Sequence, residues 1–147
     1  MRDMVSTLMV SSVPVGVVHI VWPDAIRHLQ RAIDAGRNRY RSVDLLDDIL
    51  KSNVGLWMVM DGEKSVAAYT TRVIQYPSGV KGLMVDLLGG DGMDEWLPLV
   101  VDKLKLYASD MKCGHIELVG RNGWLRALKP LGWSGESVIA SMELSDE

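Results

Sequence analysis

Three strand-like segments follow one another in the middle of the chain, joined by connections too short to hold a helix. They are "GLWMVM" (Gly55–Met60), "SVAAYTTRVIQY" (Ser65–Tyr76) and "LMVDLL" (Leu83–Leu88). The connections "DGEK" and "YPSGVKG" carry the Gly, Pro, Asp and Ser residues typical of tight turns. Consecutive strands with hairpin-length connections pair antiparallel. The sequence therefore predicts an antiparallel meander with the Ser65–Tyr76 strand at its centre, antiparallel to both neighbours.

Helical and strand patterns flank this meander. The clearest helix covers Leu97–Met111, where apolar residues recur at i, i+3, i+4 and i+7, with Pro98 in its expected first turn. The other expected elements are a strand over Val13–Trp22, a helix from Pro23 that Gly36 ends, a short helix that Ser42 caps, a strand over His115–Gly120, a short helix broken at Pro130 and a last strand over Ser137–Leu144. This order predicts one α+β domain over residues 1–147.

Charge and cysteine content narrow the possible functions. The formal net charge is -3 and the sequence pI is near 5.6, so we expect no nucleic-acid partner. We interpret the apolar N-terminal segment as a buried strand with its lead-in, not as a targeting segment, and we expect no membrane helix. The lone Cys113 cannot form a disulfide within the chain, which fits the cytoplasm. The scattered histidines predict no metal site.

A glycine-rich turn precedes the long helix in "VDLLGGDGMDEWLPLV" (Val85–Val100). Free N–H groups at a helix N-terminus suit a phosphate, and Gly90 and Gly92 would allow it to approach the backbone closely. Asp91 and Asp94 argue against this, because a carboxylate about 4 Å from a phosphate charge opposes binding by ~1–4 kcal/mol. Two hypotheses stay open: a phosphate site, or a turn whose own Asp91 and Asp94 cap the helix.

This element order, with its glycine turn before the long helix, resembles the GNAT acyltransferase superfamily from roughly Val15 to Leu144. The resemblance implies a mixed, mostly antiparallel sheet flanked by about four helices. It also implies acetyl-CoA as co-substrate, in a gap between the fourth and fifth strands. That family holds the pyrophosphate in a turn of the form Gln/Arg-x-x-Gly-x-Gly/Ala. Here Gly90 and Gly92 match the small positions, and Leu87 replaces the Gln or Arg. The implied cofactor-binding residues are Leu88, Gly89, Gly90, Asp91, Gly92 and Asn122.

Two carboxylates in apolar strands are candidate general bases. In the resembled family the strands that hold Asp86 and Glu117 flank the cleft where a base takes the amine proton, usually through water. A carboxylate there could have the raised pKa that such work needs. The alternative is that strand alternation points both side chains to solvent or into salt bridges. The short last helix ends in Gly132-Trp133, as in the family, but Leu128 replaces the tyrosine that often acts as general acid.

A basic concentration precedes the meander. It consists of Arg27, Arg31, Arg37, Arg39 and Arg41. Because the first two helices border the acceptor site in the resembled family, this patch could attract an acidic substrate or partner. The alternative is a solvated loop balanced by Asp44, Asp47 and Asp48.

The resemblance implies an N-acyltransferase with a degenerate cofactor motif, acting on the amine of a small molecule or protein. The rival is a catalytically inactive protein of the same fold that acts through its surface, which Leu87 and Leu128 favour. The segment "IELVGRNGWLRALKPLGW" is also similar to GNAT-like proteins of tailed bacteriophages. That similarity would imply host cytoplasm or virion as the location, and a protein partner in the phage or its host.

Overall fold

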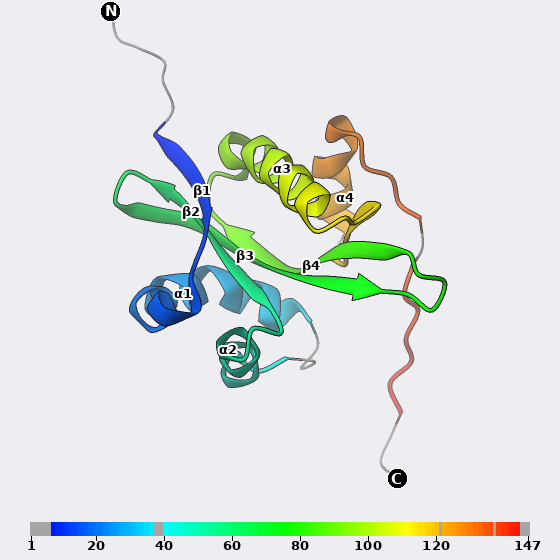
Figure 1. Cartoon of the computed structure of the whole chain (residues 1–147), viewed down its shortest axis with the longest axis horizontal. Coiled ribbons are helices and arrows are strands. Elements are labelled where there is room, and N and C mark those ends of the chain that lie inside the picture. Colours follow the sequence, from blue (N-terminus) through cyan, green and yellow to red (C-terminus); the bar gives the residue numbers. More distant parts are fainter. Residues whose placement is uncertain (1–6, 37–39, 121, 137, 145–147) are drawn as a thin grey trace, which may run out of the picture.

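A five-stranded sheet forms the centre of the molecule (Figure 1). The structure is a computed structural model, and it describes residues 7–36, 40–120, 122–136 and 138–144. The strands lie in the order β1 (Leu8–Ser12), β2 (Gly55–Asp61), β3 (Lys64–Gln75), β4 (Lys81–Gly90) and β5 (His115–Leu118). Neighbouring strands are antiparallel except β4 and β5, which are parallel. The predicted meander is confirmed, with β3 at its centre.

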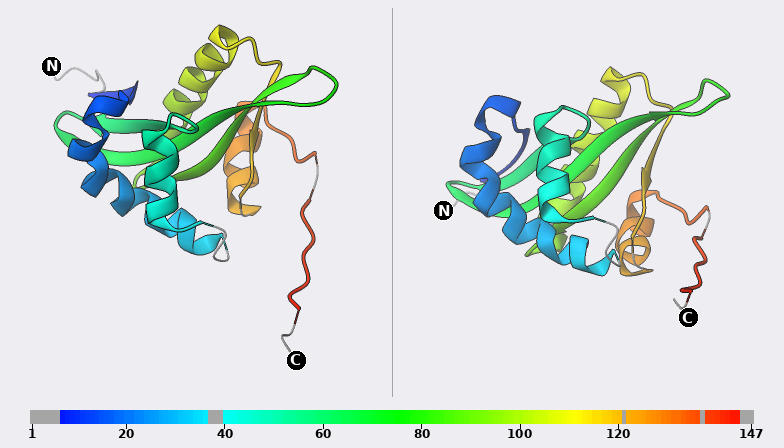
Figure 2. Two further views of the ribbon diagram at one scale, coloured as in Figure 1. Left: turned by 60° about the horizontal axis from the view of Figure 1, so that its bottom comes forward. Right: turned by 90° about the horizontal axis from the view of Figure 1, so that it is seen from below.

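Helices cover both faces of the sheet (Figures 1 and 2). On one face lie α1 (Val18–Ala35) and α2 (Ser42–Leu50), and on the other lie α3 (Met93–Asp110) and α4 (Asn122–Leu128). A short 3₁₀ turn, η1 (Val15–Val17), precedes α1, and another, η2 (Lys129–Leu131), follows α4. The sheet therefore separates two apolar cores, because its side chains alternate between the faces.

Each core joins the sheet to its pair of helices. The α3 and α4 side buries Trp57, Tyr69, Val85, Trp96, Val100 and Leu128 among others. The α1 and α2 side buries Val18, Leu29, Leu45, Ile49, Leu56 and Leu87 among others. Complete burial of one such aliphatic side chain contributes roughly 1.5–3 kcal/mol, so both layers hold the sheet in place.

The predicted strand over Val13–Trp22 is wrong. The first strand, β1, lies earlier in the sequence, and this segment instead runs through η1 into α1. The helix begins at Val18, so Pro23 lies inside it instead of at its start. Val18 is fully buried against the sheet in its helical conformation. Packing of the helix thus outweighs the strand preference of a valine-rich segment.

The predicted last strand over Ser137–Leu144 is also wrong for its described residues, 138–144, which form no strand. Their apolar side chains are exposed, with Val138 at 93% and Met142 and Leu144 at 81%. Strand preference gives a strand only where a partner edge is in reach. Residue 137 lies outside the described part of the chain.

Two predicted helix boundaries shift by a few residues. Gly36 is the C-cap of α1, as predicted. Ser42 is the first residue of α2 instead of its cap, which is Arg41. Because α3 begins at Met93, Pro98 lies beyond its first turn. The predicted short helix broken at Pro130 corresponds to α4 followed by η2.

Candidate functional site

The two parallel strands part in the middle of the sheet. Pairing of β4 with β5 runs from Gly82 opposite His115 to Val85 opposite Leu118. Beyond this point β4 continues to Gly90, whereas the chain after Leu118 leaves for α4. The main chain of β4 after Val85 therefore faces a gap in the ladder. Such a gap leaves backbone N–H and C=O groups free to bind something other than a strand.

A β-bulge places Asp86 at the point of parting. In the register with β3, Thr71 lies opposite Val85 and Thr70 lies opposite Leu87, so Asp86 is the extra residue. Bulges re-aim a side chain and bend the strand. The Asp86 carboxylate accepts a hydrogen bond from Arg72 Nε at 2.7 Å, and its side chain is only 15% exposed. The structure thus contains the ion pair that the alternative hypothesis for Asp86 predicts.

Glu117 lies on the same face of the sheet as this ion pair. Met84 is the register partner of both Arg72 on β3 and Glu117 on β5, so the three side chains share one face. Glu117 Oε1 accepts a hydrogen bond from the Tyr76 hydroxyl at 2.5 Å and lies 3.2 Å from His115 Nε2. The hydrogen bond from Tyr76 is the main cause of the lowered pKa of Glu117. The expectation of a raised pKa is therefore wrong for Glu117.

The glycine turn does not use its carboxylates as caps. The N-cap of α3 is Gly92, in a left-handed conformation, and no side chain caps the helix. Asp91 instead donates its N–H to Val66 O at 2.9 Å and accepts a hydrogen bond from Trp96 Nε1 on its own carbonyl at 2.7 Å. The prediction that Asp91 and Asp94 occupy the first-turn N–H groups is thus wrong. The physical reason for Asp91 is that its carboxylate faces α1.

Arg31 of α1 binds this carboxylate. Arg31 Nη2 lies 3.1 Å from Asp91 Oδ1. The hydrogen bond from Arg31 is the main cause of the lowered pKa of Asp91. The turn carries no basic residue of its own in sequence, so a cation 60 residues away compensates its charge. In the sequence Arg31 stands out only as one of a basic concentration, and no local spacing connects it with Asp91.

Two of the three turn glycines are needed for packing. A Cβ at Gly89 would lie 2.2 Å from His28 O, and a Cβ at Gly90 would lie 2.4 Å from Val66 O and from Ala67 Cβ. These glycines let β4 approach α1 and β3. Gly92 has φ +71°, and a Cβ added to it would meet nothing within 4 Å. Only Gly92 thus leaves open space beside the start of α3.

The donor set of the turn fits a pyrophosphate. The first-turn N–H groups of α3 have no side-chain cap, Gly92 leaves space, and Arg31 compensates Asp91. Asp94 and Glu95 lie in the first turn of α3, where their negative charges interact favourably with the positive end of the helix. An uncapped start of α3 favours the first of the two hypotheses for this turn.

Three leucines at the other positions singled out in the sequence are buried. Leu87 and Leu88 are 9% and 6% exposed and lie in opposite cores. Leu128 is 3% exposed and packs in the α3 and α4 core. Asn122 is the first residue of α4. None of the three leucines therefore replaces the polar groups that the resembled family has at two of these positions.

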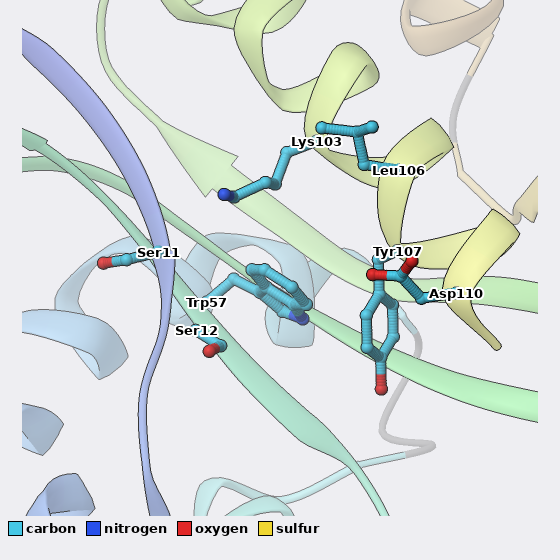
Figure 3. A pocket seen from close by; sticks show the side chains of 7 residues that line it. All are labelled: Ser11, Ser12, Trp57, Lys103, Leu106, Tyr107 and Asp110. Atoms are coloured by element: carbon cyan, nitrogen blue, oxygen red, sulfur yellow. The ribbon is translucent and has the colours of Figure 1, made fainter.

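Two hollows have linings that do not include the glycine turn. One, of about 370 Å³, lies between β1 and α3 and is lined by Trp57, Lys103 and Tyr107 among others (Figure 3). The other, of about 350 Å³, shares Tyr107 with the first and is lined also by Thr71 and Arg72. Neither is lined by a predicted site residue. The second reaches the arginine that binds Asp86, which makes it the hollow closer to the candidate base.

The described arginines of the basic segment contact different partners. Arg27 Nη2 donates to Ser65 Oγ at 3.1 Å, Arg31 binds Asp91, and Arg41 binds Asp44 at 2.8 Å. Arg37 and Arg39 lie outside the described residues. The described arginines thus match the balanced alternative more than a patch that attracts acidic partners. Of the acids expected to balance them, Asp44 does so, while Asp47 pairs with Lys51.

Metal-binding clusters and membrane helices are both absent from the part of the chain that the structure describes. That part holds no group of three or more His, Cys, Asp or Glu side chains able to hold a metal ion. None of the described helices has both the length and the apolar character needed to cross a membrane.

Solved structures resemble this fold over nearly its whole length. No family model and no curated protein matches the sequence. An aminoglycoside acetyltransferase from an uncultured soil metagenomic sample has a TM-score of 0.71 at 10% identity, with 96% of this chain and 97% of that chain covered. Ribosomal-protein-alanine N-acetyltransferase from Brucella melitensis biovar Abortus 2308 has a TM-score of 0.70 at 10% identity, with 94% and 99% covered.

A third neighbour was solved together with acetyl-CoA. This predicted acetyltransferase from Clostridium acetobutylicum has a TM-score of 0.67 at 12% identity, with 92% of this chain and 96% of that chain covered. At such identities the similarity concerns the fold. It confirms the predicted fold class, a mixed and mostly antiparallel sheet flanked by helices. The similarity to bacteriophage proteins is not tested by these neighbours and stays a prediction.

Proposed function

We propose that this chain, which has the fold of the GNAT acetyltransferases, transfers an acetyl group from acetyl-CoA to an amine. The observation that carries the proposal is the parting of β4 from β5 at Asp86, beside the uncapped start of α3. An open strand edge and a free helix N-terminus together suit a ligand with both an acyl group and phosphates. The neighbour solved with acetyl-CoA supports this choice of donor.

Two parts of the main chain would hold the donor. The N–H groups that follow Gly92 would bind its pyrophosphate, because they lie at the positive end of α3. Main-chain N–H groups of β4 beyond Val85 would polarise the carbonyl of the thioester. The donor supplies an activated acyl group when bound. Residues of this chain then have to orient the amine and take its proton.

Asp86 is the better placed of the two candidate bases. It lies at the parting of the strands, whereas Glu117 lies within the paired section and already contacts Tyr76 and His115. Arg72 orients the Asp86 carboxylate. As the amine nitrogen bonds to the carbonyl carbon and the C–S bond breaks, Asp86 accepts the amine proton directly or through water. The leaving thiolate takes its proton from solvent, because the buried Leu128 has none to give.

One observation favours the rival function, a catalytically inactive protein that acts through its surface on a phage or host protein. Leu87 and Leu128 are both packed in the cores, so two polar groups of the resembled family have no counterpart at these positions. The rival needs neither a donor site nor a base. It predicts that acetyl-CoA does not bind.

Isothermal titration with acetyl-CoA separates the two functions. The acyltransferase proposal expects saturable binding, followed by release of free thiol when a panel of primary amines is added. The panel should include small-molecule amines and peptide N-termini, since either class is compatible with the proposal. Lack of binding at millimolar acetyl-CoA would contradict the proposal and leave the surface-acting protein.

A further inference from the structure

We propose that Arg31 is a phosphate-binding residue of the donor site, supplied by α1 to a turn that has no cation of its own. This inference rests on the proposed function and assigns a residue to it. Asp91, Asp94 and Glu95 surround the turn with negative charge. In the described part of the chain, Arg31 is the one basic side chain within ion-pair distance of this turn. A pyrophosphate bound there would therefore meet Arg31 as its nearest counter-charge.

The ion pair leaves most of the guanidinium available. Arg31 contacts Asp91 through Nη2 alone, and the two side chains are 64% and 77% exposed. A guanidinium has five N–H donors in a planar fork that matches carboxylates and phosphates. Arg31 can therefore keep its bond to Asp91 and present its other edge to a phosphate. Asp91 then orients the cation, and the two roles do not compete.

Backbone packing fixes the position from which Arg31 reaches the turn. The backbone of α1 approaches β4 so closely at His28 that only a glycine fits at position 89. The His28 ring is buried and its Nε2 lies 3.0 Å from Ser65 Oγ at the start of β3. This contact is less than one helical turn before Arg31. The arginine thus projects from a helix that is held against the end of β4, next to the turn.

The test measures binding by isothermal titration, with two ligands. Acetyl-CoA carries the pyrophosphate, and S-acetylpantetheine carries the same thioester without phosphates. We expect Arg31→Gln to weaken acetyl-CoA binding by about ten- to a hundredfold, the range for hydrogen bonds to charged groups. The same substitution should leave S-acetylpantetheine binding unchanged. Arg27→Gln is the matched control, because it removes the same charge one turn earlier, and it should change acetyl-CoA affinity by less than about threefold.

A double-mutant cycle with Asp91→Asn decides how Arg31 acts. If Arg31 binds phosphate directly, Arg31→Gln weakens acetyl-CoA binding in the Asp91→Asn background as well. If it only neutralises Asp91, the loss disappears in that background, and the inference is overturned. Both side chains are mostly exposed, so the variants should stay folded, which circular dichroism and urea unfolding check.

Failure of the inference differs from failure of the proposed function. Wild-type protein that binds neither ligand overturns both together. Wild-type protein that binds acetyl-CoA, with Arg31→Gln equally tight, overturns the role of Arg31 alone. A loss of affinity for both ligands in Arg31→Gln would likewise contradict it, because S-acetylpantetheine has no group for Arg31 to bind.

Discussion

Arg72 Nε lies 2.7 Å from Asp86 Oδ2, and this ion pair spans the bulge at which β4 leaves β5. The arginine comes from β3, whose residues Ala67–Gln75 pair with the whole length of β4. A carboxylate held by a neighbouring strand at an open strand edge is oriented before any ligand arrives. This relationship makes Asp86, and not Glu117, the residue on which the catalytic proposal depends.

We expect Asp86→Asn to reduce kcat/KM for acetyl transfer by about 10²- to 10⁴-fold, the usual contribution of a general base. The affinity for acetyl-CoA should stay within about threefold of wild type, because Asn keeps the shape of the side chain. Glu117→Gln is the matched control and should retain most of the activity. Steady-state rates and titration check the two effects. Equal loss in both variants would show that Asp86 has no special role.

Two neighbouring threonines should respond differently to the same substitution. Thr71 Oγ1 accepts a hydrogen bond from the buried Trp57 Nε1 at 2.9 Å. Thr71→Val should lower the free energy of unfolding by about 1–3 kcal/mol, because it leaves that N–H unsatisfied. Thr70 Oγ1 is buried and has no hydrogen-bond partner in the described part of the chain, so Thr70→Val should be neutral or stabilising. Urea unfolding measures both, and equal costs would contradict the hydrogen-bond assignment.

The glycines of the turn should separate packing from ligand binding. Gly90→Ala should lower the free energy of unfolding by about 3 kcal/mol, because its Cβ meets the backbone of Val66 at 2.4 Å. Gly92→Ala should cost only about 1–2 kcal/mol, the cost of a left-handed residue, since its surroundings are open. Thermal unfolding compares them, and equal losses would contradict the different packing of the two positions. A side chain at Gly92, and not at Gly90, therefore gives the folded test of phosphate binding.

The pKa of Glu117 depends on Tyr76. The Tyr76 hydrogen bond lowers this pKa below its ordinary value of 4.5. It therefore stabilises the fold above about pH 4.5, and the contribution is lost as pH falls through the folded pKa. We expect Tyr76→Phe to raise the pKa of Glu117, measured by carbon NMR, and to flatten the fall in stability below pH 4.5. His115→Gln should raise the pKa less, because His115 makes the weaker contact. An unchanged pKa in Tyr76→Phe would contradict the assignment.

The meander was predictable because its information is local. Short turns join β2 to β3 and β3 to β4, so the sequence indicates both the strands and their pairing. The start of α1 was not predictable from the sequence, because valine prefers strands and Val18 is helical only where it is buried under the sheet. The strand predicted over Ser137–Leu144 is absent from its described residues, 138–144, for a related reason, since a strand pattern does not supply a partner edge.

The site was predictable to the extent that it lies on one segment of the chain. The candidate base Asp86 lies in β4 and the glycine turn follows that strand directly. An acidic residue in an apolar strand and a cluster of glycines mark these two features in the sequence. The sequence does not indicate that Arg72 pairs with Asp86 or that Arg31 pairs with Asp91, because these contacts depend on strand register and on helix packing across long sequence separations. The hypothesis that Asp91 caps α3 is wrong for this reason, since its partner Arg31 lies on another helix.

The short parallel pairing of β5 has a consequence for the kinetics of folding. The hairpins of β2, β3 and β4 close short loops, whereas β5 can join β4 only after the chain has passed through α3. β5 then holds four residue pairs with β4, and no strand of the described residues covers its other edge. Its amides and those of α4 should exchange with solvent deuterium well before those of β3, as a separate cooperative unit. Early exchange there would mean that one wall of the gap opens locally while the meander stays intact, which would let a bulky ligand enter.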